Sequence, residues 1–133
     1  MTVTDQDLVD AASAARANAY CRYSGYKVGA ALVDDRGNMH VGCNVENSAF
    51  PEGTCAEANA IASMIASGGQ AIQSILVIGG KDAPEDCTPC GGCRQKIAEF
   101  ADNSARIILV GADEKLTTYS IDELLPKSFH FPD

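Results

Sequence analysis

The sequence is poor in basic residues, with 10 Lys and Arg against 18 Asp and Glu and a formal net charge of -8 over 133 residues. The few cations are dispersed along the chain and form no cluster. Proteins that bind nucleic acids neutralise phosphates with clustered Lys and Arg. The composition therefore argues against a nucleic-acid partner and favours a small, weakly charged substrate.

Long apolar runs are also lacking. No stretch approaches the roughly 20 apolar residues that a membrane-spanning helix needs. The first ten residues contain three Asp and no Lys or Arg, and no apolar core of a signal peptide follows them. We therefore expect no membrane partner and a cytoplasmic location. Because the sequence shows no repeat, low-complexity tract or linker, residues 1–133 are expected to form a single domain.

Histidine is scarce, and this narrows the choice of metal ligands. His40 and His130 are the only two histidines and have no metal-like spacing, so neither is expected to bind a metal. The six cysteines are more typical of metal ligands or core residues than of disulfides in a cytosolic chain. Cys21 and Cys43 lack metal-like spacing and are expected in the core.

The other cysteines include three that stand where two helices are expected to begin. Thr54 is expected to accept a hydrogen bond from a first-turn amide, and residues 56–66 are rich in helix formers, which places Cys55 at a helix N-terminus. Cys90 and Cys93, three residues apart on the first turn of a second helix, present both sulfurs on one side. Helix N-termini favour thiolates. Three thiolates without a fourth protein ligand indicate a zinc site that leaves one position to water.

Glu57, two residues after Cys55, is placed to move protons beside such a water. The plainer interpretation is a solvated first-turn acid favoured by the helix dipole, just as the three cysteines could be small buried hydrophobic residues. Cys87 extends the Cys-x-x-Cys motif toward an iron–sulfur pattern, but Ile97 stands where that pattern needs a fourth cysteine. Cys87 is therefore expected to be a loop residue.

Hydrophobic periodicity predicts an α/β fold. The expected helices span residues 5–20, 55–67, 90–101 and 121–125, and the expected strands span 26–34, 39–45, 73–79, 106–110 and 116–119. The first two strands are predicted to form an antiparallel hairpin, and the buried strands followed by helices imply parallel pairing at the sheet centre. The small residues of 28–33 would let the helix that begins at Cys55 pack closely. We expect a three-layer α/β/α fold with a mixed five-stranded sheet and a ligand site at the carboxyl ends of its strands.

Six short motifs carry a resemblance to a known family. Each motif alone is common, but the six together, in this order and with this spacing, are specific. They are Tyr20-Cys21-Arg22-Tyr23-Ser24, Val28-Gly29-Ala30-Ala31-Leu32, Asn44-Val45-Glu46-Asn47, Cys55-Ala56-Glu57, Pro89-Cys90-Gly91-Gly92-Cys93-Arg94-Gln95 and Leu124-Leu125-Pro126. Over most of its length the chain resembles the small homotetrameric zinc-dependent cytidine deaminases.

The resemblance implies an enzyme of pyrimidine salvage that hydrolyses cytidine and deoxycytidine to uridine and deoxyuridine with release of ammonia. It implies one Zn²⁺ held by Cys55, Cys90 and Cys93. Glu57 would take a proton from the attacking water, deliver it to ring N3 and then protonate the departing amino group.

The resemblance also implies which residues contact the nucleoside. Asn44 and Glu46 would bind the ribose hydroxyls, Tyr26 would lie against the pyrimidine ring, and Ala56 would line the same pocket. Phe129 would reach the site of a neighbouring subunit in a homotetramer. The pattern alone leaves plainer alternatives, because Asn44 and Glu46, on one face of a strand, could cap the following loop. The aromatic tail could equally pack on its own core.

The chain departs from the family pattern at several positions. Many relatives carry Arg directly after the catalytic Glu, where this chain has Ala58, so Arg94 and two helix N-termini remain to offset the charge of a three-thiolate zinc site. Four more departures near the expected substrate entrance are Arg22, Lys27, Phe50 and Glu52. These leave open a related aminopyrimidine nucleoside as substrate, as in the blasticidin S deaminases. A zinc-stabilised binding module, which would need a fourth protein ligand, is the alternative outside enzymes.

Overall fold

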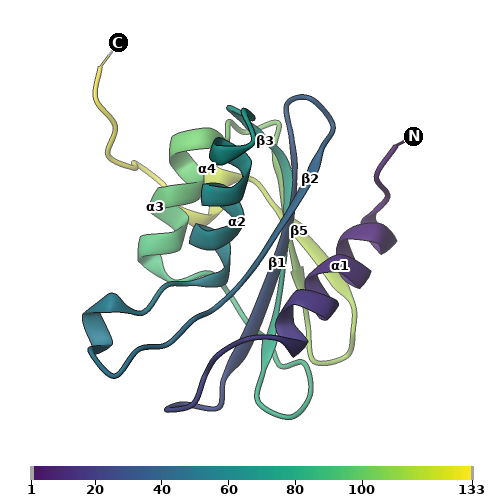
Figure 1. Ribbon diagram of the computed structural model, residues 1–133. Helices are drawn as coiled ribbons and strands as arrows, with labels where there is room; N and C mark the ends of the chain where they lie inside the picture. Colours follow the sequence, from purple (N-terminus) through teal and green to yellow (C-terminus); the bar gives the residue numbers. More distant parts are fainter. Residues whose placement is uncertain (1, 133) are drawn as a thin grey trace.

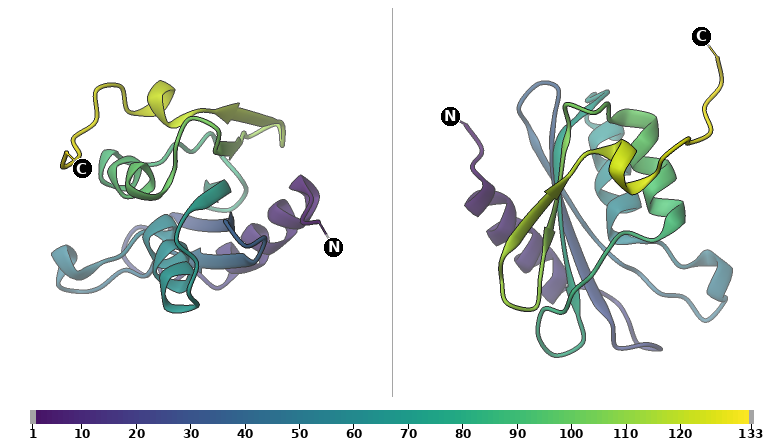
Figure 2. Two further views of the ribbon diagram at one scale, coloured as in Figure 1. Left: turned by 90° about the horizontal axis from the view of Figure 1, so that it is seen from above. Right: turned by 180° about the vertical axis from the view of Figure 1, so that it is seen from behind.

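A computed structural model describes residues 2–132, which form three layers around one five-stranded sheet of order β2-β1-β3-β4-β5. Helix α1 covers one face of the sheet, and α2, α3 and α4 lie on the other (Figure 1, Figure 2). The strands are β1 (Lys27–Asp34), β2 (Met39–Cys43), β3 (Ile72–Gly80), β4 (Arg106–Val110) and β5 (Leu116–Tyr119). The helices are α1 (Asp5–Ala17), α2 (Ala56–Ala66), α3 (Gly91–Phe100) and α4 (Ile121–Leu124), with a short 3-10 helix, η1 (Phe50–Glu52). The predicted fold class is confirmed.

Both kinds of strand pairing expected from the sequence are present. β1 pairs with β2 as an antiparallel hairpin, and β1 also pairs antiparallel with β3. β3 and β4 are parallel, which requires a crossover connection, and α3 supplies it. Helix α2 connects β2 to β3 across β1. The loops that leave the carboxyl ends of β2 and β3 therefore lead into α2 and α3, the two helices that carry the predicted metal ligands.

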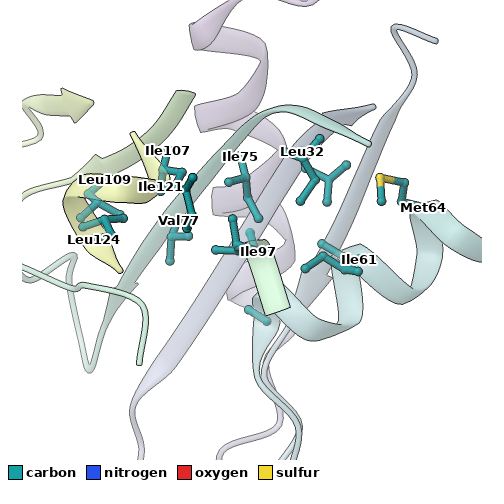
Figure 3. Close-up of a cluster of buried hydrophobic side chains, with 14 residues drawn as sticks. Leu32, Ile61, Met64, Ile75, Val77, Ile97, Ile107, Leu109, Ile121 and Leu124 are labelled. Carbon is teal, nitrogen blue, oxygen red and sulfur yellow. The ribbon is translucent and has the colours of Figure 1, made fainter. Parts of the chain in front are cut away.

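Alternate residues of the central strands face two separate hydrophobic cores. The core beneath α2, α3 and α4 takes from these strands Ala30, Leu32, Ile75, Val77, Ile107 and Leu109 (Figure 3). The core beneath α1 takes Ala31, Val33, Leu76, Ile78, Ile108 and Val110. Burial on both faces explains why these strands are continuously apolar. The sheet is thus a rigid frame for the loops at its ends.

Two glycines set how closely the helices approach the sheet. A Cβ at Gly29 in β1 would overlap the Ala12 carbonyl oxygen of α1, and a Cβ at Gly42 in β2 would lie 2.5 Å from the Ala56 carbonyl oxygen of α2. Within residues 28–33, Gly29 thus admits α1, and Ala30 lies in one core with Ala56 and Ala60 of α2, as expected for this segment. The closest approach of α2 is to β2, because α2 crosses the sheet over that strand.

Helix α1 ends at Ala17, three residues earlier than predicted. Tyr20 instead pairs with the segment after β2, donating its N–H to the Asn44 carbonyl (3.0 Å) and accepting from the Glu46 N–H (2.7 Å). The same pairing ends β2 at Cys43, two residues earlier than predicted. Tertiary pairing here overrides local helix propensity. Within residues 2–132 no helix has the length and apolarity to cross a membrane; the longest, α1, has 13 residues.

A buried Asp34–His40 pair, which the sequence did not reveal, fixes the turn between β1 and β2. The Asp34 carboxylate lies 2.8 Å from His40 Nε2 and accepts hydrogen bonds from the Arg36 and Asn38 amides. Burial opposes ionisation, but the hydrogen bonds from His40 and these amides hold the pKa of Asp34 below its ordinary value. His40 therefore has a structural partner at the end of the hairpin remote from the predicted ligands.

Candidate functional site

The sulfur atoms of Cys55, Cys90 and Cys93 all lie within 4.8 Å of one another. Cys55 is the N-cap residue of α2, Cys90 is the N-cap residue of α3, and Cys93 lies in the first turn of α3. No other group of three or more His, Cys, Asp or Glu within residues 2–132 could hold a metal ion. Thiolates are preferred zinc ligands, and three of them without a fourth protein ligand match a catalytic rather than a structural site. The donor set therefore fits a zinc ion.

The backbone before α2 fixes the position of Cys55. Thr54 and Val45 exchange two backbone hydrogen bonds of 2.9 and 3.0 Å. The Asn59 side-chain amide donates to the Cys43 carbonyl (2.8 Å) and the Thr54 hydroxyl (3.1 Å). The prediction that Thr54 caps the helix is wrong, because its hydroxyl is bound to Asn59 and Cys55 itself is the N-cap residue. No side chain caps the first turn of α2, so its amide dipoles remain available to stabilise a thiolate.

Glu57 lies in the first turn of α2 and lines the same cleft as the three cysteines. Its side chain is only 4% exposed, which contradicts the alternative of a solvated surface acid. Burial raises the pKa of Glu57. A carboxyl group whose pKa is raised toward neutrality can both accept and return a proton, as general acid–base catalysis requires.

The cysteines differ in their electrostatic surroundings. Burial opposes ionisation of Cys90, but its sulfur accepts a hydrogen bond from the Cys93 amide (3.4 Å), and the pKa of the Cys90 thiol is lowered. Burial raises the pKa of Cys93, and the neighbouring Glu57 carboxylate adds to this effect. Burial likewise raises the pKa of Cys55. Three sulfurs beside a carboxylate are readily ionised together only when a cation offsets their charge, as a bound divalent ion would.

Arg94 holds the start of α3 in place. Its Nε donates to the Pro89 carbonyl (2.9 Å), directly before Cys90, and its Nη1 donates to the Leu124 carbonyl (2.8 Å) at the end of α4. Within residues 2–132 its side chain makes no hydrogen bond to a cysteine. Arg94 therefore positions the α3 N-terminus, and its predicted support of the thiolate charge stays a prediction.

A cleft of about 330 Å³ opens beside the three sulfurs. Its walls come from the start of β1, the segment between β2 and α2, the first turns of α2 and α3, and the loop before α3. The lining residues are Tyr26, Val28, Asn44, Val45, Glu46, Phe50, Gly53, Thr54, Cys55, Ala56, Glu57, Cys87, Thr88, Cys90 and Cys93. Predicted substrate contacts Tyr26, Asn44, Glu46 and Ala56 are thus brought together with the metal-ligand candidates, at the carboxyl end of β2 and β3.

Asn44 and Glu46 line the cleft although the strand that was expected to carry them ends at Cys43. Asn44 accepts from the Val28 amide and donates to the Tyr26 carbonyl, both at 2.8 Å. The backbone nevertheless stays extended beyond β2, because Val45 pairs with Tyr20 and with Thr54, so residues 44 and 46 share one face as predicted. Asn44 thus fixes the start of β1 in the cleft wall and does not cap the loop that follows it, which was the plainer alternative.

The Glu46 carboxylate is held by its own set of donors. It accepts hydrogen bonds from the Tyr23 and Ser24 amides (2.9 and 3.1 Å) and from the Ser24 hydroxyl. The Ser24 hydroxyl bond comes first among the causes that keep the pKa of Glu46 below its ordinary value. Glu46 is consequently a fixed anion at the rim of the cleft, and this role for Tyr23 and Ser24 had no signal in the sequence beyond their place in a family motif.

Tyr26 and Cys87 form a contact in the cleft wall that the sequence did not predict. Burial, reinforced by the hydrogen bond with the Cys87 thiol, raises the pKa of the Tyr26 hydroxyl to about 12. Gly79 in β3 leaves the space for this thiol, because a Cβ there would lie 2.7 Å from Cys87 Sγ. Cys87 is a loop residue outside the metal-ligand group, as predicted.

Phe129 lies on the C-terminal segment that extends away from the sheet (Figure 1). Its ring is 68% exposed and packs edge-on against Phe131, which is 82% exposed. Gln95 Nε2 donates to the Phe129 carbonyl (2.9 Å) and ties this segment to α3. Phe129 does not line the cleft of its own chain. Its predicted contact with a neighbouring subunit therefore stays a prediction.

Of the four departures expected near the substrate entrance, one lines the cleft. Phe50 of η1 is 74% exposed and packs edge-on against Tyr23, with ring centroids 5.9 Å apart. The Arg22 guanidinium stacks over the ring of Tyr23, and its central carbon lies 5.9 Å from the centre of that ring. Lys27 and Glu52 do not line the cleft.

Residues 2–110 match the family described as the cytidine and deoxycytidylate deaminase zinc-binding region. The chain is 35% identical over 124 residues to a cytidine deaminase of Sporosarcina psychrophila, covering 93% of this chain and 90% of that protein. It is 27% identical over 110 residues to a blasticidin-S deaminase of Bacillus cereus, covering 78% of this chain and 77% of that protein.

Solved structures give the same comparison. The fold superposes on a cytidine deaminase from Burkholderia pseudomallei with a TM-score of 0.86 and 38% sequence identity, over 95% of this chain and 99% of that one. The superposition thus includes nearly the whole of both chains.

Proposed function

The chain belongs to the cytidine and deoxycytidylate deaminase zinc-binding family, and from this we propose that it is a single-domain, zinc-dependent cytidine deaminase. It hydrolyses cytidine and deoxycytidine to uridine and deoxyuridine and releases ammonia. The observation that carries the proposal is the grouping of Cys55, Cys90 and Cys93 within 4.8 Å beside a buried Glu57 in one cleft. A binding module would need a fourth protein ligand and would have no use for this carboxyl group.

The three cysteines would hold the zinc ion, and bound zinc supplies the acidity that brings the pKa of a coordinated water toward neutrality. The remaining steps belong to Glu57. Its carboxylate takes a proton from the attacking water and delivers it to ring N3, which makes C4 electrophilic. The water oxygen bonds to C4, and Glu57 then takes the proton of the resulting C4 hydroxyl and gives it to the amino group as the C4–N bond breaks, so that the products are ammonia and a uracil nucleoside. Its burial keeps bulk water from exchanging with the proton in transit.

The cleft suits a neutral nucleoside better than a phosphorylated one. Glu46 would accept hydrogen bonds from ribose hydroxyls at the rim, and Tyr26 and Ala56 would face the base. A carboxylate fixed by three donors attracts hydroxyl groups but repels an added phosphate. Acting on cytidine and deoxycytidine would place the protein in pyrimidine salvage, and we propose a cytoplasmic location for it.

A panel of substrates tests the proposal. Zinc-loaded protein should release ammonia from cytidine and deoxycytidine, and more slowly from cytosine, deoxycytidine monophosphate and blasticidin S. Turnover of blasticidin S above that of cytidine would favour the alternative enzyme, to which the chain is less similar than to cytidine deaminases. Stoichiometric zinc without ammonia release from any of the five compounds would overturn the proposal in favour of a binding module.

Within this panel, we expect cytosine to have a kcat/KM about 10⁴ to 10⁵ times lower than cytidine, because a site built to bind hydroxyls is left with unpaired polar groups when they are absent. Glu46→Gln should reduce the ratio between these two kcat/KM values, because it lowers kcat/KM for cytidine and leaves kcat/KM for cytosine unchanged. Glu52→Gln, an exposed acid of η1 outside the cleft, is the matched control and should leave both values unchanged. Equal efficiency on cytosine and cytidine in the unmutated protein would contradict the sugar-binding role.

We further propose a homotetramer in which Phe129 completes the cleft of a neighbouring subunit. The exposure of Phe129 and Phe131 on an extended C-terminal segment supports burial of these rings across an interface. Phe129→Ala and Glu57→Gln subunits, each weak or inactive alone, should recover activity after subunit exchange, because some mixed sites have both residues intact.

Light scattering and a labelled-subunit assay check the assembly and the exchange. Phe129→Ala subunits mixed with subunits that carry both substitutions are the control, because no site in that mixture contains Phe129 and none should recover activity. A fully active monomer, or no recovery after proven exchange, would refute the contact across subunits.

A further inference from the structure

The Glu46 carboxylate is held in place by the donors of one short segment, residues 23–24. Its Oε1 accepts the Tyr23 and Ser24 amides (2.9 and 3.1 Å), and its Oε2 accepts the Ser24 hydroxyl. Within residues 2–132 no Lys, Arg or His forms an ion pair with Glu46. An ionised carboxylate offers about four acceptor sites. Both sites of Oε1 are therefore filled, and Oε2 keeps one site for a hydroxyl of the substrate.

The Ser24 hydroxyl is itself oriented by the backbone. Its oxygen accepts the Tyr26 N–H (3.0 Å), and its proton is donated to Glu46 Oε2. A serine hydroxyl has a single proton, so in this arrangement Ser24 donates to Glu46 and to no other group. The direction in which the remaining acceptor site of Oε2 points is thus set by the Ser24 hydroxyl, which is anchored to the chain at Tyr26.

Ser24 holds Glu46 from outside the cleft. A hollow of about 360 Å³ adjoins the cleft and is lined by Tyr23, Ser24, Glu46, Asn47, Phe50 and Gly53. Glu46 lines both the hollow and the cleft, whereas Ser24 lines only the hollow. A nucleoside in the cleft would therefore contact Glu46 and would not contact Ser24.

The wall that would face the base is held by other bonds. The Asn44 side chain donates to the Tyr26 carbonyl and accepts the Val28 amide, both at 2.8 Å. These bonds remain when the Ser24 hydroxyl is removed. The Tyr26 N–H that bonds to this hydroxyl lies in an exposed segment, where water can replace the lost acceptor. Loss of the hydroxyl should therefore disturb the orientation of Glu46 and leave the start of β1 in place.

We propose that Ser24 is a specificity-determining positioning residue, which directs the Glu46 carboxylate at the sugar hydroxyls and thereby gives the cleft its selectivity for nucleosides. It acts through Glu46 without touching the substrate. A carboxylate that is already fixed loses little freedom when a hydroxyl binds to it, so more of the hydrogen-bond energy appears as affinity. Without the Ser24 hydroxyl, binding would have to order the carboxylate first. The inference rests on the proposed function, in which Glu46 binds the sugar.

Ser24→Ala tests this, because it removes the hydroxyl alone. Dissociation constants are measured by equilibrium dialysis in the Glu57→Gln background, so that the nucleoside is not consumed. Cytidine should bind about 10- to 100-fold more weakly, the range for one hydrogen bond to a charged group. The probe 2′,3′-dideoxycytidine keeps the base and the sugar ring but lacks two hydroxyls, and its affinity should not change. With Glu57 intact, KM for cytidine should rise while kcat changes little.

Three variants control the result. Ser24→Thr keeps the hydroxyl and should retain the affinity for cytidine. Ser104→Ala is the matched control, because the amide and hydroxyl of Ser104 donate to Asp102 in the same way on the turn before β4, and it should have no effect. Ser24→Ala added to Glu46→Gln should cost little more than Glu46→Gln alone, since the two residues act as one unit.

Two results would overturn the inference. One is an unchanged affinity for cytidine in Ser24→Ala. The other is an equal loss for cytidine and dideoxycytidine, because this would show a general disturbance of the cleft wall. If the unmutated protein binds cytidine but releases no ammonia from it, the proposed function fails, while the dissociation constants still decide the role of Ser24.

Discussion

Glu57→Gln is expected to fold and to bind zinc at one ion per chain, yet to lose nearly all turnover of cytidine. The amide has the size of the carboxyl group but cannot accept the proton of water at neutral pH. A single general acid–base step contributes about 10² to 10⁴ in rate, and Glu57 would serve in more than one step, so the loss should reach or exceed that range. The measurements are kcat for cytidine, zinc content and the thermal unfolding midpoint.

Glu114→Gln is the matched control, since it makes the same chemical change on the exposed turn between β4 and β5. Its kcat should equal that of the unmutated protein. A Glu57→Gln protein that keeps kcat within about tenfold of normal would mean that another group carries the protons, because the rate contribution of even one such step is larger.

Much of the frame that holds Glu57 was predictable. Segments such as Ile75–Ile78 and Ile107–Val110 are apolar at every residue, which only a strand covered on both faces requires, and both are buried within the sheet. The two helix starts were predictable because Cys90 and Cys93 share one side of a first turn and helix formers follow Cys55. Local pattern and tertiary structure agree at these positions.

The sequence was less informative where a distant segment decides the local structure. Thr54 has the side chain of a helix cap, but Asn59 binds its hydroxyl and the backbone pairs with Val45. Helix α1 ends early because Tyr20 pairs with residues after β2. The pairing of Thr54 with Val45 and of Tyr20 with residues after β2 depends on the completed fold, so no spacing rule could give it.

The sequence also did not predict contacts between side chains that are far apart along the chain. The Tyr26–Cys87 pair depends on Gly79, which lies in a third segment and makes room for the sulfur. Motif spacing identified the metal-ligand candidates, whereas the contacts around them required the three-dimensional arrangement.

The metal itself should depend on Cys90 and not on Cys87. Cys90→Ala should lose stoichiometric zinc, because two sulfurs remain of the three that lie within 4.8 Å. The loss of affinity should exceed the roughly 10- to 100-fold that is typical of removing an outer-shell partner. Zinc per chain after dialysis and chelator competition measure it. Cys87→Ala should keep its zinc, since its thiol contacts Tyr26 and lies outside the ligand group.

Cys90 is also the N-cap residue of α3, and its sulfur accepts the Cys93 amide. Losing a cap costs about 0.5 to 2 kcal/mol of stability, so Cys90→Ala alone could release zinc by fraying the helix. Cys90→Ser separates the two causes, because a serine hydroxyl caps well but is a poor zinc ligand. We expect Cys90→Ser to recover the unfolding midpoint of the metal-free protein without recovering zinc. Stoichiometric zinc in Cys90→Ala, or its loss in Cys87→Ala with an intact fold, would refute the assignment of the three ligands.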